Sequence, residues 1–505
     1  MEQDRKNGLI TGIYAQVNEL IAQADKNGQT DAKADFMEKQ ILKGVLNLGL
    51  ELLKLSIATR QEQIEASGKP KVAGKIVNKG LVPRFYQSIF GELEISHRKY
   101  HIGGKGLYYP LDASLNLPKQ KHSYVIQDWI GKSSTDLDYR ESVSMLNEIL
   151  GLDLNATQSK SNVNNLGQDV AAYYSEQAIE PVSAGNFLCV EWDGKGVPII
   201  KQERQATKGQ EEESAVSVIG RLKKGEKRGI KKAATVSVVS DFLPKIRGKD
   251  RIIRGLFKSP LTILEEEKEP KLELKHAQVN TNNWHQNIHR RAFMSNQEKS
   301  INYGVELAQK RSQNQAIPIV ALIDGGVGLE DAILAAFEEK GMASQLKHII
   351  LDIVHVSEYV WKAGNAIFGE SSHLRTPWVK EVLTDILDSK VGKVIDDLIA
   401  NRDKTNLSES KQKQLNTSIT YFTNHQHKMD YKTYLEQGYP VSTALVESSC
   451  GHLVKDRMER SGMRWSMDGA QNMLDARAVK KNGDWSDFMT FITTKNQEAY
   501  YEKAA

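Results

Sequence analysis

The sequence predicts an α/β fold for the larger part of the chain, and three runs of residues lead to this prediction. Apolar residues fill 316–323 and 348–356, as is typical of buried strands. The residues between them, 331–340, have the spacing of an amphipathic helix. Two strands that a helix joins through short loops form a parallel pair covered by that helix. We therefore expect an α/β layer here.

Length and composition narrow the class of protein. The chain has 505 residues, of which 40% are hydrophobic and 26% charged, as in globular proteins of several domains. Its two cysteines exclude a disulfide framework and a zinc site of four cysteines. No apolar run approaches the ~18 residues of a membrane span, and the N-terminal MEQDRKNG is too polar for a signal peptide. A cytoplasmic protein without a membrane partner is expected.

The first 180 residues read as three modules. Residues 1–66 have helical periodicity and form an N-terminal helical region. Residues 67–120 are rich in Gly and Pro and predict a small antiparallel β module. Residues 121–180 predict a helix over 139–150, a C-cap at Gly151 and a second helix from Ala156. The second helix carries polar residues suited to base edges and phosphates: Gln158, Ser159, Lys160, Ser161, Asn162, Asn164 and Asn165. A helix-turn-helix DNA reader and an ordinary helical hairpin both fit this last module.

The remaining residues predict a core that a helical segment interrupts. Residues 186–200 read as a hairpin turning at Asp193-Gly194, and 233–242 as a third strand. The first part of the core is expected over 181–356. Residues 357–441 have helical patterns throughout and predict an all-helical insertion. Residues 442–505 predict the last helices of the core.

Positive charge is concentrated in one stretch. The net charge is +4, from 68 basic and 64 acidic residues. Residues 221–258 hold thirteen Lys or Arg and three Asp or Glu, a local charge of +10, so the rest of the chain carries −6. Such a concentration is typical of a surface that binds a polyanion, although a solvated loop is the plainer interpretation.

Three carboxylates stand where phosphodiester chemistry needs them. Asp193 follows the strand FLCVEW, Asp324 ends the strand AIPIVALI, and Glu447 lies in a helix near 442–460. Carboxylates from strand ends and a helix can converge on a pair of Mg²⁺ ions that activates an attacking oxygen and stabilises the leaving one. Each residue also has a structural interpretation, since Asp-Gly is a common turn and a glutamate on a helix is usually solvated.

Two longer motifs carry a resemblance to a known family. Residues 350–361 read ILDIVHVSEYVW, and residues 449–485 read SCGHLVKDRMERSGMRWSMDGAQNMLDARAVKKNGDW. Together they closely resemble bacterial insertion-sequence transposases of the ISKra type, which are DDE enzymes similar in layout to Mutator-type transposases. WDGKGVP and ALIDGG match the family's first two acidic motifs. The resemblance covers about residues 85–490.

The resemblance implies a function and a fold. It implies an RNase H-like core of the retroviral-integrase type, and Mg²⁺-dependent cleavage and transfer of DNA at terminal inverted repeats. The implied metal ligands are Asp193, Asp324 and Glu447, which would hold two Mg²⁺ or Mn²⁺ ions. Asp352 and His355 match a supporting D-x-x-H motif, which we place on the strand 348–356. A homo-oligomer on double-stranded DNA is also implied.

The chain departs from the family at one point. Family members usually carry a zinc-ribbon-like segment of cysteines before PLD, but here Ile102 and Lys105 occupy the cysteine positions. We therefore expect no zinc.

DNA contacts are expected from two basic clusters. The first lies in 221–232, which has seven positive charges against one negative and would contact phosphates without reading sequence. The second lies in the C-terminal motif, where a solvated helix face and a buried tryptophan are the alternatives. The residues are Lys223, Lys224, Lys227, Arg228, Lys231, Lys232, Lys455, Arg457, Arg460, Arg464 and Trp465.

Two other function classes share these features. One is a DNA-binding protein with an inactive core, and the other is a structure-specific nuclease without strand transfer. The two cysteines give a separate expectation: Cys189 precedes Asp193 by four residues and Cys450 follows Glu447 by three, so both thiols should be buried near the site.

Overall fold

The chain forms two compact units in the computed structural model. The structure describes residues 2–68, 75–104, 106–200, 230–257, 284–294, 296–313, 315–404, 407–460 and 462–501. One unit comprises Met1–Gln177 with Asp475–Ala505, and the other comprises Ala178–Leu474. Each unit is described on its own.

The first unit begins with a helical hairpin and a small sheet, as the sequence predicts. Helices α1 (Glu2–Gly28) and α2 (Ala34–Ala66) precede an antiparallel sheet in the order β1-β2-β3. Its strands are β1 (Ile76–Ser88), β2 (Gly91–Ile102) and β3 (Gly106–Tyr108). Ile102, at one of the family's cysteine positions, is fully buried, and Asp112 binds Arg84 and His97. Apolar packing and a buried polar cluster therefore hold this module.

Helices complete the first unit: α3 (Pro110–Ser114), α4 (Tyr124–Ser134), α5 (Tyr139–Leu150), α6 (Ala156–Glu176) and α19 (Trp485–Tyr500). Helix α5 ends at Gly151 in the left-handed conformation (φ 66°), which confirms the predicted C-cap. The predicted polar face of α6 is turned inward in part, because Ser159 and Asn162 are buried. Ser159 shares a hydrogen bond with Ser134, and Asn162 donates to the carbonyl of Gln127. These two residues join helices and do not face a solvent-exposed ligand.

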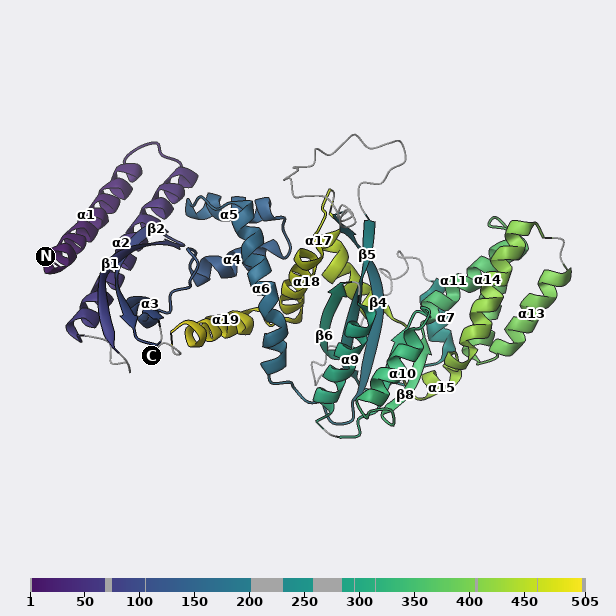
Figure 1. Cartoon of the computed structure of the whole chain (residues 1–505). Coiled ribbons are helices and arrows are strands. Elements are labelled where there is room, and N and C mark those ends of the chain that lie inside the picture. The colour runs from purple at the N-terminus through teal and green to yellow at the C-terminus, as the bar shows by residue number, and fades with distance from the viewer. Residues whose placement is uncertain are drawn as a thin grey trace, which may run out of the picture. The chain divides into compact units, whose positions relative to one another are not determined.

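The second unit contains a mixed five-stranded sheet in the order β6-β5-β4-β7-β8 (Figure 1). Its strands are β4 (Phe187–Ile199), β5 (Ile230–Phe242), β6 (His285–Met294), β7 (Ile319–Ile323) and β8 (Leu346–Leu351). β4, β5 and β6 are antiparallel neighbours, whereas β4, β7 and β8 run parallel. Helix α10 (Leu329–Glu339) joins β7 to β8, which confirms the expected strand–helix–strand unit and the α/β class.

Alternation along β4 sends its side chains to two faces of the sheet. Helix α9 (Gln297–Ser312) covers the face of Val190 and Trp192, whose indole N–H donates to the Ser300 carbonyl. A Cβ at Gly304 would lie 3.0 Å or less from three sheet side chains, so glycine permits this close approach. The other face of β4 carries Cys189, Glu191 and Asp193 in alternation.

Two predicted strand boundaries are wrong. Residues 187–199 form one continuous strand and not a hairpin at Asp193-Gly194, because β5 pairs with β4 along its whole length, including Gly194 with Thr235. The strand predicted over 348–356 ends at Leu351. Asp352 then caps helix α11 (Ile353–Phe368) by accepting a hydrogen bond from the Val354 N–H.

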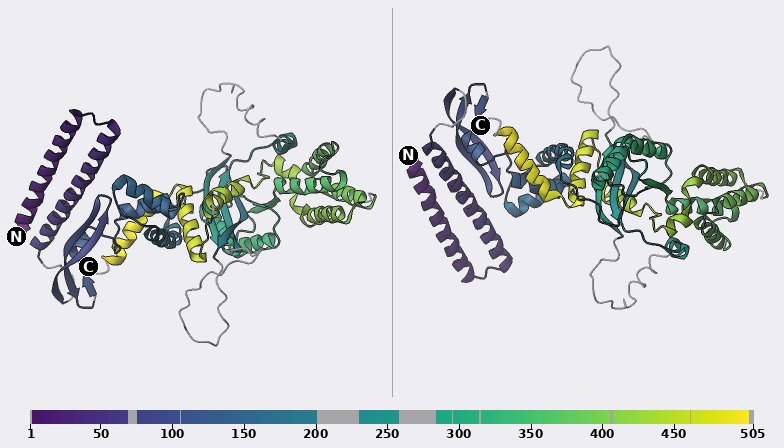
Figure 2. Two further views of the ribbon diagram at one scale, coloured as in Figure 1. Left: turned by 90° about the horizontal axis from the view of Figure 1, so that it is seen from above. Right: turned by 90° about the horizontal axis from the view of Figure 1, so that it is seen from below.

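The described residues from 353 to 436 are helical apart from short connections, as predicted for the insertion. The elements after α11 are α12 (Arg375–Leu387), α13 (Val391–Lys404), α14 (Glu409–His425), η1 (Gln426–Lys428) and α15 (Tyr431–Glu436). Figure 2 shows α11 to α14 grouped beside the sheet in both views. A short helix α7 (Lys249–Phe257) follows β5.

The chain then returns to the sheet through α16 (Ala444–Ser449), the π-helical turn η2 (Cys450–Lys455) and α17 (Asp456–Met458). Helix α18 (Met467–Asn482) follows, and the division between the two units falls within it. Across the described ranges, no helix has the length and apolar character needed to cross a membrane.

Candidate active site

Asp193 and Asp324 line the same pocket in the second unit. Their strands β4 and β7 are parallel neighbours, with Glu191 opposite Leu322, so both aspartates lie toward the same edge of the sheet. The pocket has a volume of ≈ 400 Å³, and its walls include Gly194 and Gly326. Two carboxylates that the sequence places 131 positions apart are thus brought to one cavity.

The two aspartates repel each other. Burial raises the pKa of Asp193, and the charge of Asp324 raises it further, while a hydrogen bond with Cys450, the Gly194 N–H and the charge of His355 oppose the shift. Across the described ranges, no Lys or Arg forms an ion pair with Asp193, Asp324 or Glu447. Carboxylate oxygens are the donors that Mg²⁺ prefers, so the chemistry of Asp193 and Asp324 suits such an ion. Asp193, Asp324 and Glu447 do not, however, form a group of three ligand atoms within 4.8 Å of one another.

Glu447 is not among the residues that line the pocket of Asp193 and Asp324, nor among those that line a larger pocket beside Asp324. It lies on α16, and three residues later Cys450 hydrogen-bonds to Asp193. Burial raises the pKa of the Cys450 thiol, and the charges of Asp193 and Glu447 add to that shift. The Glu447 side chain is exposed. Both cysteines are buried, as expected. The helix changes to a π-helical turn at Cys450, three residues after Glu447, a feature common at functional sites.

The loop that carries Asp324 is held from behind by helix α14. The Tyr421 hydroxyl donates to the Asp324 carbonyl, and the Gly326 N–H donates to the Asp324 carboxylate at 2.9 Å. Gly325 has φ +88°, and a Cβ there would lie 3.0 to 3.2 Å from Leu351, His425 and Tyr421. Glycine is therefore required between the strand and the helical region.

Asp324 also lines a larger pocket of ≈ 880 Å³. Helices α11 and α14 form its walls, and His355 lies in it. The structure places His355 in the first turn of α11 and not on a strand, with its side chain 40% exposed. Amide and hydroxyl side chains recur every fourth residue along the α14 wall: Gln412, Asn416, Thr420 and Asn424. A polar groove thus leads away from the carboxylates.

Asp352 does not line either pocket. Its carboxylate is buried, where it accepts hydrogen bonds from the Val354 N–H and from the Thr443 hydroxyl at 2.8 Å. Thr443 immediately precedes α16. Asp352 thus contacts the residue before the helix that carries Glu447, and its supporting role in the site stays a prediction.

Sequence reasoning missed Glu191 and Lys195. Glu191 is fully buried on β4, and burial raises its pKa to about 8, while the Val446 N–H, Cys189 and Arg290 oppose that shift and Asp352 adds to it. Lys195 lies near enough to lower the pKa of Cys450. The signal was the alternation of Cys189, Glu191, Asp193 and Lys195 on one face of a strand.

Cys189, Glu191 and His285 also form a compact group, with one potential ligand atom from each within 4.8 Å of the others. Each of the three residues already makes a hydrogen bond. Cys189 donates to Glu191 at 3.6 Å, and His285 shares a hydrogen bond with Ser240 at 2.9 Å. This group is explained by hydrogen bonding within the sheet.

The predicted DNA contacts divide into three groups. Lys223, Lys224, Lys227 and Arg228 lie outside the described residues. Lys231, Lys232, Lys455, Arg460 and Arg464 are exposed, and Lys231 pairs with Glu459. Arg457 and Trp465 are buried.

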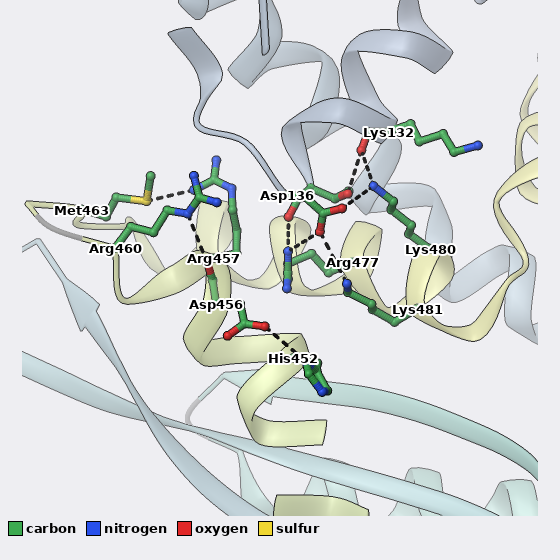
Figure 3. Close-up of polar contacts among 11 residues, drawn as sticks. Lys132, Asp136, His452, Asp456, Arg457, Arg460, Met463, Arg477, Lys480 and Lys481 are labelled. Atoms are coloured by element: carbon green, nitrogen blue, oxygen red, sulfur yellow. Dashed lines mark hydrogen bonds and ion pairs between the residues drawn. The ribbon is translucent and has the colours of Figure 1, made fainter. Parts of the chain in front are cut away.

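Arg457 and Trp465 support the chain after α17. Arg457 donates to the Met463 sulfur, Arg460 donates to the Asp456 carbonyl (Figure 3), and the Trp465 N–H donates to the Met458 carbonyl. The Trp465 backbone also pairs with Pro198 and Ile200. Arg457 and Trp465 are therefore buried and bonded within the protein, and the structure does not present them to DNA as the sequence predicts.

Basic residues of the same motif also lie in the first unit. Arg477, Lys480 and Lys481 surround Asp136 (Figure 3). Burial alone would raise the pKa of Asp136, but these three cations lower it below its usual value. They are engaged in holding α18 to the loop after α4.

Comparison with known proteins gives no assignment. Neither the protein-family models nor the curated proteins yielded a match to this chain.

Proposed function

We propose that the chain is a DDE transposase of an insertion sequence, which binds terminal inverted repeats and catalyses metal-dependent DNA strand cleavage and transfer. The observation that carries the proposal is the shared pocket of Asp193 and Asp324, with the helix of Glu447 bonded to Asp193 through Cys450. The sequence resemblance supplies the reaction, and the shared pocket of the two aspartates supports it.

The topology supports an RNase H-like core. Three antiparallel strands followed by two parallel ones, with the first strand central, bring the ends of β4 and β7 together. A helical region between β8 and α16 corresponds to the expected insertion. The acidic residues then come from two strands and a late helix, as in the proposed class.

Asp193, Asp324 and Glu447 would hold the metal, which when bound activates the attacking oxygen and stabilises charge at phosphorus. The protein side chains then have separate tasks. Tyr421 and Gly325 fix the loop of Asp324, and Cys450 orients Asp193. His355, at the pocket wall, would contact a phosphate of the bound strand.

The two surfaces beside the carboxylates suit a DNA strand. The polar groove along α14 has both Lys362 and Lys413 and both Glu358 and Glu409 in its walls, so it favours bases and sugars over a run of phosphates. The exposed Lys231 and Lys232 on β5 would contact the backbone of the duplex.

The test is cleavage of a supercoiled plasmid that carries the element's terminal repeats, in Mg²⁺. Glu447→Gln should reduce the rate by about a thousandfold, as expected for the loss of a metal ligand worth several kcal/mol. Glu436→Gln, an exposed glutamate on α15, is the matched control and should cleave like wild type. Equal rates for Glu447→Gln and wild type would contradict the assignment.

Detection of joined DNA products distinguishes a transposase from the two alternative function classes. Labelled end DNA should be captured into a target plasmid by the wild-type protein. Cleavage without any joined product would indicate a structure-specific nuclease, and binding without cleavage would indicate an inactive DNA-binding protein.

A further inference from the structure

One side of the helix that carries Glu447 rests on a set of buried polar contacts. Thr443, Val446 and Ser449 are spaced by three residues and so face the same direction. Each makes a hydrogen bond with a residue outside the helix, and the three partners come from three separate elements of the second unit. Glu447 itself is exposed, one position beyond this face.

The three contacts have the usual distances of hydrogen bonds. The Thr443 hydroxyl donates to Asp352 at 2.8 Å, and the Val446 N–H donates to the Glu191 carboxylate at 3.0 Å. The Arg290 guanidinium donates to the Ser449 hydroxyl at 3.0 Å, and that hydroxyl donates in turn to the Leu445 carbonyl. The helix is thus fixed near its beginning, in its first turn and at its end.

The contact of Glu191 is the central one. The Val446 N–H lies in the first turn of α16, where backbone N–H groups have no acceptor within the helix. Its acceptor is a carboxylate from the strand that also carries Asp193, two residues further along the same face. Glu191 therefore links the backbone of α16 directly to the strand of Asp193.

We propose that Glu191 is a positioning residue for Glu447. It fixes the distance between the Glu447 helix and strand β4, with Asp352 and Arg290 securing the two ends of α16, and it does not itself touch metal or DNA. The inference rests on the proposed function, because it gives Glu191 the task of positioning Glu447 relative to Asp193, and both are proposed metal ligands. Partners of this kind typically change metal affinity by about 10- to 100-fold when they are removed.

The test compares three variants by Mn²⁺ binding, followed by electron paramagnetic resonance, and by hydrogen exchange of residues 444–449. Glu191→Leu should weaken Mn²⁺ binding by about tenfold or more and speed exchange in α16. Glu191→Gln retains an acceptor for the Val446 N–H and should stay within about threefold of wild type. Val190→Ala is the control, since Val190 is equally buried on the opposite face of β4 and its truncation destabilises the core without touching α16.

The outcomes separate the inference from the proposed function. Equal Mn²⁺ affinities for Glu191→Leu and Val190→Ala would overturn the positioning role, as would faster exchange in α16 with unchanged Mn²⁺ binding. Wild-type protein that neither binds Mn²⁺ nor cleaves DNA would overturn the proposed function itself. If Glu191→Leu does not fold, Ser449→Ala and Thr443→Val remove the two outer contacts singly. Each should weaken Mn²⁺ binding by about two- to fivefold, and no change in either would count against the role.

Discussion

Asp241 and Asp193 lie on neighbouring strands of one sheet, yet their surroundings are opposite. Asp241, near the end of β5, is fully buried, and the Arg311 guanidinium and the Asn186 and Asn287 amides all donate to its carboxylate. Asp193 is half-buried at a pocket, beside another aspartate that raises its pKa.

The difference shows how the fold uses carboxylates in two ways. A buried carboxylate with a guanidinium and two amides is satisfied within the protein and supports the sheet. Two carboxylates that repel each other at an open pocket store unfavourable energy, which a bound cation relieves. The first kind should govern stability, and the second kind should govern activity.

Asp193→Asn and Asp324→Asn should have the largest effect on activity. Each removes an oxygen charge from the shared pocket, and strand cleavage in Mg²⁺ should fall by about a thousandfold, or ~4 kcal/mol in the barrier. Thermal unfolding should be unchanged or shift upward, because the repulsion is relieved. Asp331→Asn, on the exposed surface of α10, is the control for cleavage. A large loss of stability in Asp193→Asn or Asp324→Asn would show that these aspartates support the fold, as Asp241 does.

Arg311→Met should have the largest effect on stability. It leaves the Asp241 charge buried without its cation, and urea unfolding should show a loss of about 3–5 kcal/mol. The double variant Asp241→Asn with Arg311→Met should recover part of that loss, since no charge is then buried. A loss below about 1 kcal/mol in the single variant would mean that water reaches Asp241.

A smaller effect is expected from acidification at His285, which lies close to Asp241. Burial lowers the pKa of His285 to about 4, the charge of Arg247 lowers it further, and Asp241 opposes the shift. The pKa of His285 in the folded state is below its value of about 6.5 in the unfolded state. Its contribution to the free energy of unfolding is therefore fully present above about pH 6.5 and is lost as the pH drops toward 4.

The measurement is urea unfolding of wild type and His285→Gln at pH 7 and pH 5. The wild type should lose about 2 kcal/mol more than the variant between these pH values. His373→Gln, an exposed histidine, should follow the wild type. If the free energies of unfolding of wild type and His285→Gln change equally between pH 7 and pH 5, the His285 imidazole is not held neutral by burial.

The sequence was sufficient where the signal is local. The apolar run before Asp324, the helical pattern of the insertion and the glycine after α5 all depend on neighbouring residues, and the structure agrees with them. Glu447 was a candidate because of its place in a predicted helix, and the resemblance implied its role as a metal ligand. The RNase H-like assignment, the metal and the DNA contacts stay predictions.

The sequence misled where distant pairing decides the structure. Asp193-Gly194 has turn chemistry, but pairing with β5 keeps it extended. The apolar run through Val356 favoured a strand, yet Asp352 ends β8 by capping α11. In the sequence, Glu191 is one polar residue in an apolar run. Its role as the acceptor of the Val446 N–H cannot be read there, because Val446 lies 255 positions away.

The most direct measurement is an anomalous-scattering map of Mn²⁺-soaked crystals of the full chain. We expect a peak bounded by the carboxylates of Asp193, Asp324 and Glu447, and we expect it to be lost in Asp324→Asn crystals. Manganese bound only between Cys189, Glu191 and His285, or no peak among the three carboxylates at saturating Mn²⁺, would contradict it.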